Sequence, residues 1–329
     1  MTANGIGVGV IGCGLIGRKR LLNLPEDCRP VAVYDVVQEA AVAASALTAD
    51  APYVAGSTAE ILNDPDISIV VVATNHAGLA VTAHQVLQHG KHVLIEKPGS
   101  ISAEALRPIV GLAESSGLCA HVGFNHRFHP SMLLARELIH SGTYGELLWV
   151  RGRYGHGGRI GYEKEWRADR RVSGGGELLD QGSHLIDLNR FFFGDANLVY
   201  SRLTTSFWDM EVEDNAFLVL EPMTGGTSWL HASWTEWKNT FSLEITLRTA
   251  KIDINGLGGS YGPETLTLFE MQPEMGPPPS TVHTWDKTDD SWKLEFGDFL
   301  GAISGKPSIG ATVQDAFATL SVIERAYQQ

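Results

Sequence analysis

The stretch His92-Val93-Leu94-Ile95-Glu96-Lys97-Pro98 decides how the chain is interpreted. A short apolar run that ends at a proline predicts a buried parallel strand, and the ligands of parallel sheets gather at the carboxyl ends of the strands. Lys97 therefore stands at a position where burying a lysine costs free energy unless the side chain has a role or a partner. The Lys97–Pro98 bond is an X–Pro bond, in which the cis form costs little free energy. A lysine that reaches from a strand edge to water explains these residues equally well, so the rest of the chain must decide.

The composition places the chain among soluble proteins of two domains. It has 329 residues, of which 43% are hydrophobic and 19% charged. The net charge of −13 argues against a nucleic-acid or anionic-membrane partner, but not against a small anionic ligand. The three cysteines lack metal-binding spacing and are typical of reduced, intracellular proteins. The N-terminus does not resemble a signal peptide, and no apolar run is long enough to span a membrane. The sequence therefore predicts a cytoplasmic protein.

A glycine-rich turn near the N-terminus predicts a dinucleotide site. The apolar strand Ile6–Ile11 precedes it, and residues at helical spacing follow from Arg18 to Leu24, which is the context that the G-x-G-x-x-G pattern requires. The glycines would form the turn, admit the pyrophosphate and let helix and strand pack closely, while the helix N-terminus supplies N–H donors. A plain strand-to-helix turn is the alternative. The expected phosphate-binding residues are Gly12, Cys13, Gly14, Leu15, Ile16 and Gly17.

The next two strands add to this prediction. Strand Val31–Asp35 ends in Asp35, at about the distance from the glycines where an acid binds the adenosine ribose. A carboxylate there repels a 2′-phosphate, so NAD is favoured over NADP; capping of the following helix is the other role open to Asp35. The apolar strand 67–73 ends at Thr74-Asn75-His76, which we expect beside the dinucleotide together with Glu96 and Lys97.

The organisation changes after Gly123. Up to that point strands and helices alternate, which predicts a doubly wound parallel sheet in a first domain, residues 1–123. In the remainder, residues 124–329, segments with alternating apolar and polar residues predict strands between 147 and 269. Helices are expected at 292–304 and 313–327. This predicts a second α/β domain with a large, mostly antiparallel sheet. Its tryptophans, Trp229, Trp234 and Trp237, are expected in the core and a subunit interface.

The second domain carries the run from Gly174 to Asp187. Asp180 and His184 are four residues apart and would share one face of a helix, where a histidine beside a carboxylate gives and takes protons near neutral pH. Asp187, one turn later, could orient or cap. Metal ligation by Asp180, His184 and Asp187, or a buried structural histidine, are the alternatives.

Two arginines and a tryptophan are the candidate substrate-binding residues, beside Asp180 and His184. The segment 155–176 is rich in glycine, arginine and aromatic residues and has Trp166-Arg167 at its centre; a long polar loop of this kind favours function. Arg167 and Arg127 would clamp a phosphate or carboxylate on the substrate.

Taken together, Gly12-x-Gly14-x-x-Gly17, the Gly90–Pro98 run and the Gly174–Asp187 run resemble the Gfo/Idh/MocA family of oxidoreductases. The resemblance implies an N-terminal Rossmann domain, a C-terminal α/β domain, and dimers or tetramers formed through its sheet. Lys97 matches the family's active-site lysine, Asp180 its helix carboxylate and His184 its acid/base histidine. The sequence departs from many members at Asn75 and Leu79, where they have proline and histidine.

We therefore expect an NAD-dependent oxidoreductase that transfers a hydride between nicotinamide and a secondary alcohol or ketone of a sugar, inositol or sugar derivative, C3 of a nucleotide sugar included. His184 would take the proton, Lys97 would hydrogen-bond the same oxygen, and Asp180 would hold the imidazole or substrate hydroxyls. No metal is expected. A redox-neutral enzyme that cleaves glycosides with captive NAD is one alternative. A dinucleotide sensor, which need not keep Lys97 and His184, is the other.

Overall fold

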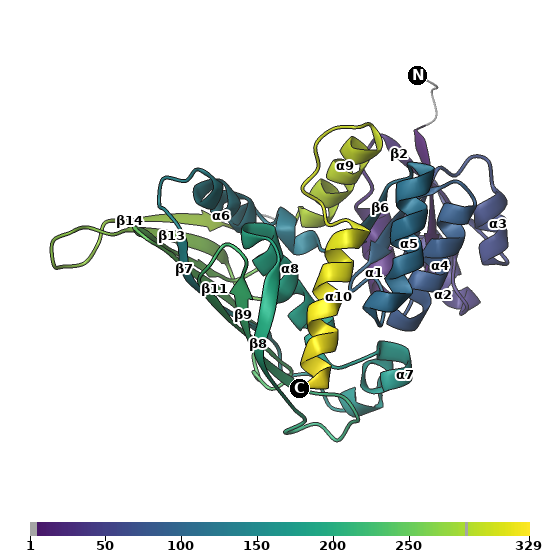
Figure 1. Ribbon diagram of the computed structural model, residues 1–329. Helices are drawn as coiled ribbons and strands as arrows, with labels where there is room; N and C mark the ends of the chain where they lie inside the picture. The colour runs from purple at the N-terminus through teal and green to yellow at the C-terminus, as the bar shows by residue number, and fades with distance from the viewer. Residues whose placement is uncertain (1–4, 287–288) are drawn as a thin grey trace. The chain divides into compact units, whose positions relative to one another are not determined.

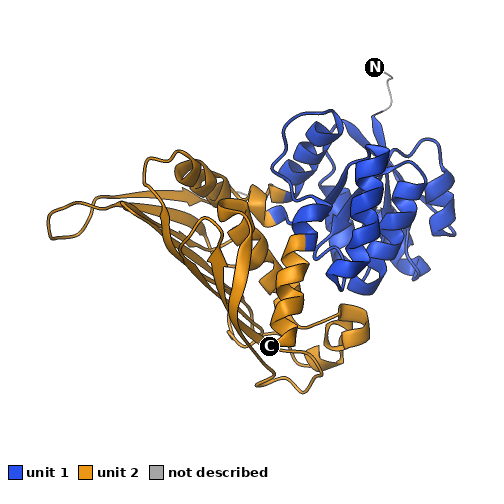
Figure 2. Ribbon diagram, in the orientation of Figure 1, with its two compact units in different colours: residues 1–125, 292–317 blue, residues 126–291, 318–329 orange. Residues whose placement is uncertain are grey.

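Each half of the chain is built on its own sheet. The computed structural model describes residues 5–286 and 289–329 (Figure 1). Unit 1 comprises Met1–Asn125 and Trp292–Phe317, and unit 2 comprises His126–Ser291 and Ala318–Gln329 (Figure 2). Within the described residues, none of the helices combines the length and apolarity that crossing a bilayer requires.

Unit 1 contains a six-stranded sheet in the order β3-β2-β1-β4-β5-β6, with every neighbouring pair parallel. All four residues of β4 are buried, because a parallel sheet is covered on both faces. The doubly wound domain expected from the sequence is confirmed. Its strands are β1 (Ile6–Ile11), β2 (Cys28–Tyr34), β3 (Tyr53–Val54), β4 (Ile69–Val72), β5 (His92–Glu96) and β6 (Ala120–Gly123). Its helices are α1 (Leu15–Leu22), α2 (Gln38–Ser45), α3 (Thr58–Asn63), α4 (His76–Gln88) and α5 (Ala103–Ser116).

A late segment of the chain returns to unit 1. Helix α9 (Ser291–Ile303) places Phe296 and Phe299 in the same buried cluster as the strand residues of the parallel sheet. Farther on, the Val122 amide donates to the Ala311 carbonyl at 2.8 Å. Unit 2 therefore differs from the expected domain 124–329, which included this segment. The apolar face of α9 explains the difference, since it completes the core of unit 1.

Unit 2 contains an eight-stranded sheet in the order β14-β13-β12-β11-β7-β10-β9-β8. Its pairs are antiparallel except β10 with β7, as expected for a mostly antiparallel sheet. Side chains alternate along β11, buried on one face and partly exposed on the other. The strands are β7 (Leu147–Gly155), β8 (Ala196–Thr204), β9 (Asn215–Pro222), β10 (Thr227–Ser233), β11 (Thr240–Leu247), β12 (Ala250–Asn255), β13 (Glu264–Glu270) and β14 (Ser280–Trp285).

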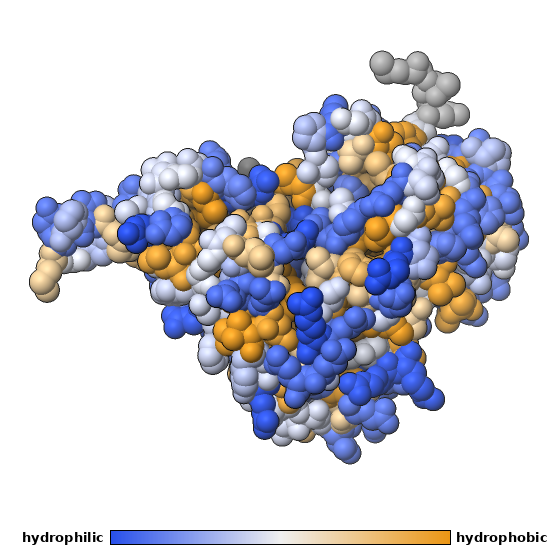
Figure 3. Space-filling model, viewed as in Figure 1, coloured by the Kyte–Doolittle hydropathy of each residue, from blue (hydrophilic) through white to orange (hydrophobic). Residues whose placement is uncertain are grey.

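Helix α8 packs on β7, β9 and β10, as does η4, and α6 packs on β13. On the other face, Trp229 is half exposed, whereas Trp234 is fully buried and Trp237 lies exposed after the strand. The face drawn in Figure 3 intersperses hydrophilic and hydrophobic residues over both units. The helical segments are η1 (Asn125–Phe128), α6 (Pro130–His140), η2 (Tyr162–Lys164), η3 (Trp166–Ala168), α7 (Arg170–Ser173), η4 (Leu178–Gly182), α8 (Ser183–Phe193) and α10 (Val313–Gln328), which continues from unit 1.

Candidate active site

The glycine turn after β1 has the shape of a dinucleotide cradle. Gly12 has φ +98°, and a Cβ there would lie 2.4 Å from the Ala73 carbonyl oxygen, so no other residue fits. A Cβ on Gly17 would lie 1.8 Å from the Gly12 carbonyl oxygen, which explains the close approach of α1 to the turn. A Cβ on Gly14, by contrast, meets nothing within 4 Å. This open side, at the N-terminus of α1, is where a pyrophosphate fits.

Asp35 lies directly beside this cradle. Its Oδ2 accepts the Cys13 amide at 2.6 Å and its Oδ1 accepts the Val37 amide at 2.9 Å. The carboxylate therefore stabilises both the turn and the chain entering α2. The N-cap residue of α2 is Val37 rather than Asp35, and ribose binding by Asp35 stays a prediction. Val36 and Val37 are exposed and bring no cation for a 2′-phosphate. The residues present fit NAD.

The ends of β1, β4 and β5 meet at one edge of the parallel sheet, because these strands are neighbours. Thr74, Asn75 and His76 follow β4, and Asn75 caps α4 by accepting the Gly78 amide at 3.1 Å. Lys97 follows β5, two strands from the glycine turn, and the Lys97–Pro98 peptide is cis. The expected cofactor-side residues therefore share one sheet edge.

Glu96 takes part in a buried ion-pair cluster. Arg20, from α1, lies between Glu96 and Glu295 and donates to both carboxylates, and all three side chains are almost fully buried. Burial disfavours the Arg20 charge, but the two carboxylates outweigh it and raise the pKa of Arg20 above its ordinary value. The Glu96 carboxylate therefore stabilises the end of β5, next to Lys97.

In unit 2, the Gly174–Asp187 run forms a short π-helical turn, η4, followed by α8. The expectation of one regular helix that carries both Asp180 and His184 was incomplete, because η4 has a wider winding than an α-helix. π-turns inside helices are frequent at functional sites. Asp180, His184 and Asp187 are all buried.

Glu213 anchors the start of this run. Its Oε1 accepts the Gly176 amide at 3.0 Å, the Leu178 amide at 3.1 Å and the Tyr327 hydroxyl at 2.8 Å. Burial raises the pKa of Glu213 even though these hydrogen bonds lower it. Side chains from the end of the chain and from the loop before β9 thus hold the backbone that leads to Asp180.

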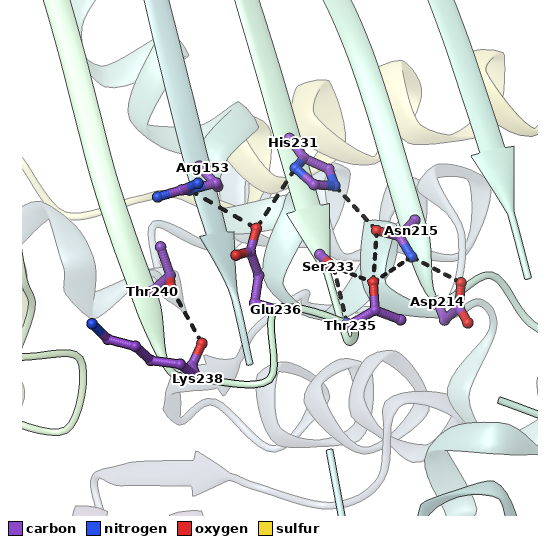
Figure 4. Close-up of polar contacts among 9 residues, drawn as sticks. All are labelled: Arg153, Asp214, Asn215, His231, Ser233, Thr235, Glu236, Lys238 and Thr240. Atoms are coloured by element: carbon purple, nitrogen blue, oxygen red, sulfur yellow. Dashed lines mark hydrogen bonds and ion pairs between the residues drawn. The ribbon is translucent and has the colours of Figure 1, made fainter. Parts of the chain in front are cut away.

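A polar network holds the residues that follow Glu213 (Figure 4). The Asn215 amide nitrogen donates to Asp214 Oδ1 and to Thr235 Oγ1, each at 3.0 Å, and Asn215 Oδ1 lies 3.1 Å from His231 Nε2. Burial, assisted by Arg153, lowers the pKa of His231 to about 4, so this ring is neutral at neutral pH. The network ties β9 to β10 and fixes the backbone beside Glu213.

Arg127 and Asp187 form a bidentate ion pair. Arg127 Nε lies 2.8 Å from Asp187 Oδ2, and Nη2 lies 2.6 Å from Oδ1. Their side chains are only 5% and 1% exposed, and the guanidinium lies over the Phe191 ring. Asp187 thus pairs with Arg127, and the orienting or capping role expected for it beside Asp180 and His184 stays a prediction.

Arg167 and Asp180 form a second ion pair, with Arg167 Nε 3.0 Å from Asp180 Oδ2. Burial lowers the pKa of Arg167, but Asp180 is the main partner that raises it above its ordinary value. The guanidinium stacks on the Trp166 ring at 4.6 Å, and its side chain is still 32% exposed. The Trp166-Arg167 loop therefore reaches Asp180 and presents a partly accessible cation there.

His184 lies in an aromatic cluster that the sequence did not predict. The His126 ring lies 3.7 Å from the His184 ring, and Tyr154 lies edge-on to both. Tyr261 packs on Tyr154, and burial raises the pKa of Tyr261 to about 12. His126 precedes Arg127 in the sequence, and this position could have indicated that His126 belongs to the candidate site. The sequence around Tyr261, in a loop between β12 and β13, gave no such indication.

The geometry does not match metal ligation by Asp180, His184 and Asp187, because the two aspartates each bind a guanidinium group. Across residues 5–286 and 289–329, no three His, Cys, Asp or Glu side chains come together in a metal-binding arrangement.

Comparison with known proteins identifies both units. Residues 6–124 match the family model described as oxidoreductase family, NAD-binding Rossmann fold, and residues 132–259 match the model of the GFO/IDH/MocA C-terminal domain. A levoglucosan dehydrogenase of Pseudarthrobacter phenanthrenivorans is 29% identical over 67% of this chain, but the match spans 60% of its own length. An inositol 2-dehydrogenase of Saccharopolyspora erythraea is 29% identical over 98% of this chain and 92% of its own.

A solved structure of levoglucosan dehydrogenase in complex with NADH and levoglucosan shares the fold. It superimposes with a TM-score of 0.88 over 99% of this chain and 98% of that one, at 20% identity.

Proposed function

The chain belongs to the Gfo/Idh/MocA family of oxidoreductases, and from this premise we propose that it is an NAD-dependent dehydrogenase of a secondary alcohol on a sugar, inositol or sugar derivative. The observation that carries the proposal is the position of Lys97 at the same sheet edge as the cradle formed by Gly12, Gly14 and Asp35. The carboxyl ends of parallel strands are where the ligands of such sheets bind, so Lys97 lies at the edge where the reacting group is expected. The dehydrogenase names of two relatives support the same class.

The chain's own residues supply binding and proton transfer in this proposal, while NAD, when bound, accepts the hydride. Lys97 donates a hydrogen bond to the reacting oxygen and stabilises the negative charge that develops on it. His184 takes the hydroxyl proton, since an imidazole works as a base near neutral pH. In ketone reduction the same groups act in reverse.

Asp180 and the Trp166-Arg167 loop provide substrate recognition in the proposal. Asp180 accepts hydrogen bonds from sugar hydroxyls, and its pairing with Arg167 fixes its direction. Arg167, which is partly exposed, binds a phosphate or carboxylate where the substrate carries one. Arg127 is the weaker candidate for that role, because its guanidinium already binds Asp187.

The proposed setting is the cytoplasm, with two or four copies of the chain associated through the C-terminal sheet. The half-exposed Trp229 on the open face of the sheet supports an interface there. Analytical ultracentrifugation of the wild type and of Trp229→Glu tests the assembly, and a smaller particle for the variant is expected. A particle of unchanged size for the variant contradicts an interface on this face.

The function is tested by following the absorbance of reduced nicotinamide with NAD or NADP and a panel of free sugars, inositols, glycosides and nucleotide sugars. Sustained reduction of NAD by one substrate class is expected. Consumption of a glycoside without net NADH points instead to the redox-neutral alternative. Binding of NAD and a sugar with no turnover of any kind points to a sensor.

A further inference from the structure

Two imidazole rings lie against one another in the buried part of unit 2. The centroids of His126 and His184 are 3.7 Å apart and their planes are inclined by 36°. His126 comes from η1 and His184 from α8, and they are 7% and 5% exposed. At this distance two protonated rings repel strongly, because little water screens them.

His126 is itself held on its other sides. The Tyr154 hydroxyl lies 3.5 Å from His126 Nε2, and the Tyr154 ring is edge-on to His126 at 5.2 Å. The Phe241 ring approaches edge-on at 6.3 Å. Burial, with Tyr261 and two carboxylates, raises the pKa of Tyr154 well above its ordinary value, so its hydroxyl keeps its proton. Side chains of β7 and β11 therefore contact His126 on these sides.

The support extends to a second layer. Gln181 Nε2, from η4, donates to the Tyr261 hydroxyl at 2.9 Å, and Tyr261 hydrogen-bonds Tyr154. On another side, the His129 ring lies 5.6 Å from His126, and its Nδ1 is 3.0 Å from Glu264 Oε2. The segment that carries His184 is thus connected back to His126 through η4, the Tyr261 loop and β7.

We propose that His126 is a positioning residue for His184: the adjoining His126 ring fixes the plane of the His184 imidazole, and protonation of either ring disfavours protonation of the other. This inference rests on the proposed function, since it gives His184 its proton-transfer geometry. The titratable and charged groups around the pair are Tyr154, Tyr261, His129 with Glu264 and Asp289, Asp180 of η4, Glu177 directly before η4, and the Arg127–Asp187 pair.

Two substitutions separate the two effects of His126. His126→Phe keeps a flat ring in the stack but removes the titratable nitrogens, and His126→Ala removes the ring. Because a neighbouring like charge disfavours protonation, His126→Phe should move the acidic limb of the kcat profile to higher pH and restore kcat to within about 3-fold of the wild type above that limb. His126→Ala should lower kcat by about 10- to 100-fold at every pH, because the base is no longer oriented. KM should change by less than about 3-fold in both.

The direct measurement is an NMR titration of the histidine rings in the ligand-free protein, labelled at carbon ε1. In the wild type, the His126 and His184 signals should each report two coupled steps. In His126→Phe, His184 should titrate in one step, with its midpoint raised by at least about half a pH unit. His184→Gln should raise the His126 midpoint by the same amount, because coupling is reciprocal. His140→Phe, a change of an exposed histidine of the same unit, is the control and should leave both signals unchanged.

The results separate this inference from the proposed function. If the wild type reduces NAD with a sugar but the His184 titration is the same in His126→Phe, the pairing is wrong and the function stands. If no substrate is oxidised but the coupled titration is observed, the pairing stands and the function fails. A His126→Ala enzyme with wild-type kcat contradicts the positioning role. Should the His126 variants not fold, single-step titration of both rings in the wild type overturns the proposal by itself.

Discussion

Arg127 and Asp187 are joined by two parallel hydrogen bonds, 2.8 and 2.6 Å long, although 60 residues separate them. The pair links the start of unit 2 to α8, the helix that begins with Ser183 and His184. Removing one member of a buried ion pair leaves the other charge without compensation. We predict that Arg127→Met lowers the free energy of unfolding by about 3–5 kcal/mol, measured by urea denaturation.

The double variant Arg127→Met/Asp187→Leu is the matched control for this prediction. It should recover much of the lost stability, because no uncompensated charge remains buried. Equal losses for the single and double variants would show that the contact with Phe191, rather than the ion pair, matters.

The glycine turn gives a prediction that separates folding from cofactor binding. Gly14→Ala should leave the melting temperature unchanged, since a Cβ there meets nothing within 4 Å, but should abolish NADH binding by filling the open side of the cradle. Gly17→Ala should lower the melting temperature, because its Cβ would lie 1.8 Å from a carbonyl oxygen. Calorimetry and fluorescence titration with NADH check the two. A Gly14→Ala protein that binds NADH normally would place the pyrophosphate elsewhere.

Asp35 should determine the choice between the two dinucleotides. Asp35→Asn keeps the shape and removes the charge; its single amide oxygen can accept only one of the two backbone amides that the carboxylate binds. We predict about 10-fold weaker NADH binding and tighter NADPH binding than in the wild type, since a charged acceptor is lost and a 2′-phosphate is no longer repelled. Equilibrium titration of both nucleotides measures the change, with the exposed Asp50→Asn as control. Unchanged preference would reduce Asp35 to a turn-stabilising role.

Glu213 should make stability depend on pH. Its pKa is raised in the folded protein, chiefly by burial, so the folded state holds a proton that the unfolded state releases. Its contribution to stability is therefore present below the unfolded pKa, about 4.3, and is lost as the pH rises through the folded value. Glu213→Gln keeps Oε1 as an acceptor and should gain melting temperature relative to the wild type as the pH increases. A difference that does not vary with pH would contradict the raised pKa.

The sequence predicted best those features that depend on residues close together in the chain. The strand, glycine turn, helix and acid of residues 6–35 follow one another in a fixed order, so each supports the next, and the structure has all of them. The Gly174–Asp187 run was recognised, but the π-turn was not, because hydrophobic spacing does not distinguish it from an α-helix. Strand β14 (Ser280–Trp285) was not foreseen, because the expected strands ended at residue 269.

Contacts across long separations could not be predicted. No periodicity shows that Arg127 pairs with Asp187, that the His126 ring adjoins the His184 ring, or that α9 returns to the first unit. These contacts depend on how the helices and strands pack against one another once they have formed. The roles of Lys97, Asp180 and His184 came from their positions in the sequence together with the family resemblance, and they stand as proposals.

The central claim is that Lys97 acts on the reacting oxygen in an NAD-dependent oxidation. Steady-state NADH formation should be compared for the wild type, Lys97→Met and the exposed-lysine control Lys293→Ala, with NADH affinity measured for each. We predict that Lys97→Met loses at least about 100-fold in kcat while it binds NADH within about 3-fold of the wild type, and that Lys293→Ala is unchanged. Wild-type turnover by Lys97→Met would contradict it.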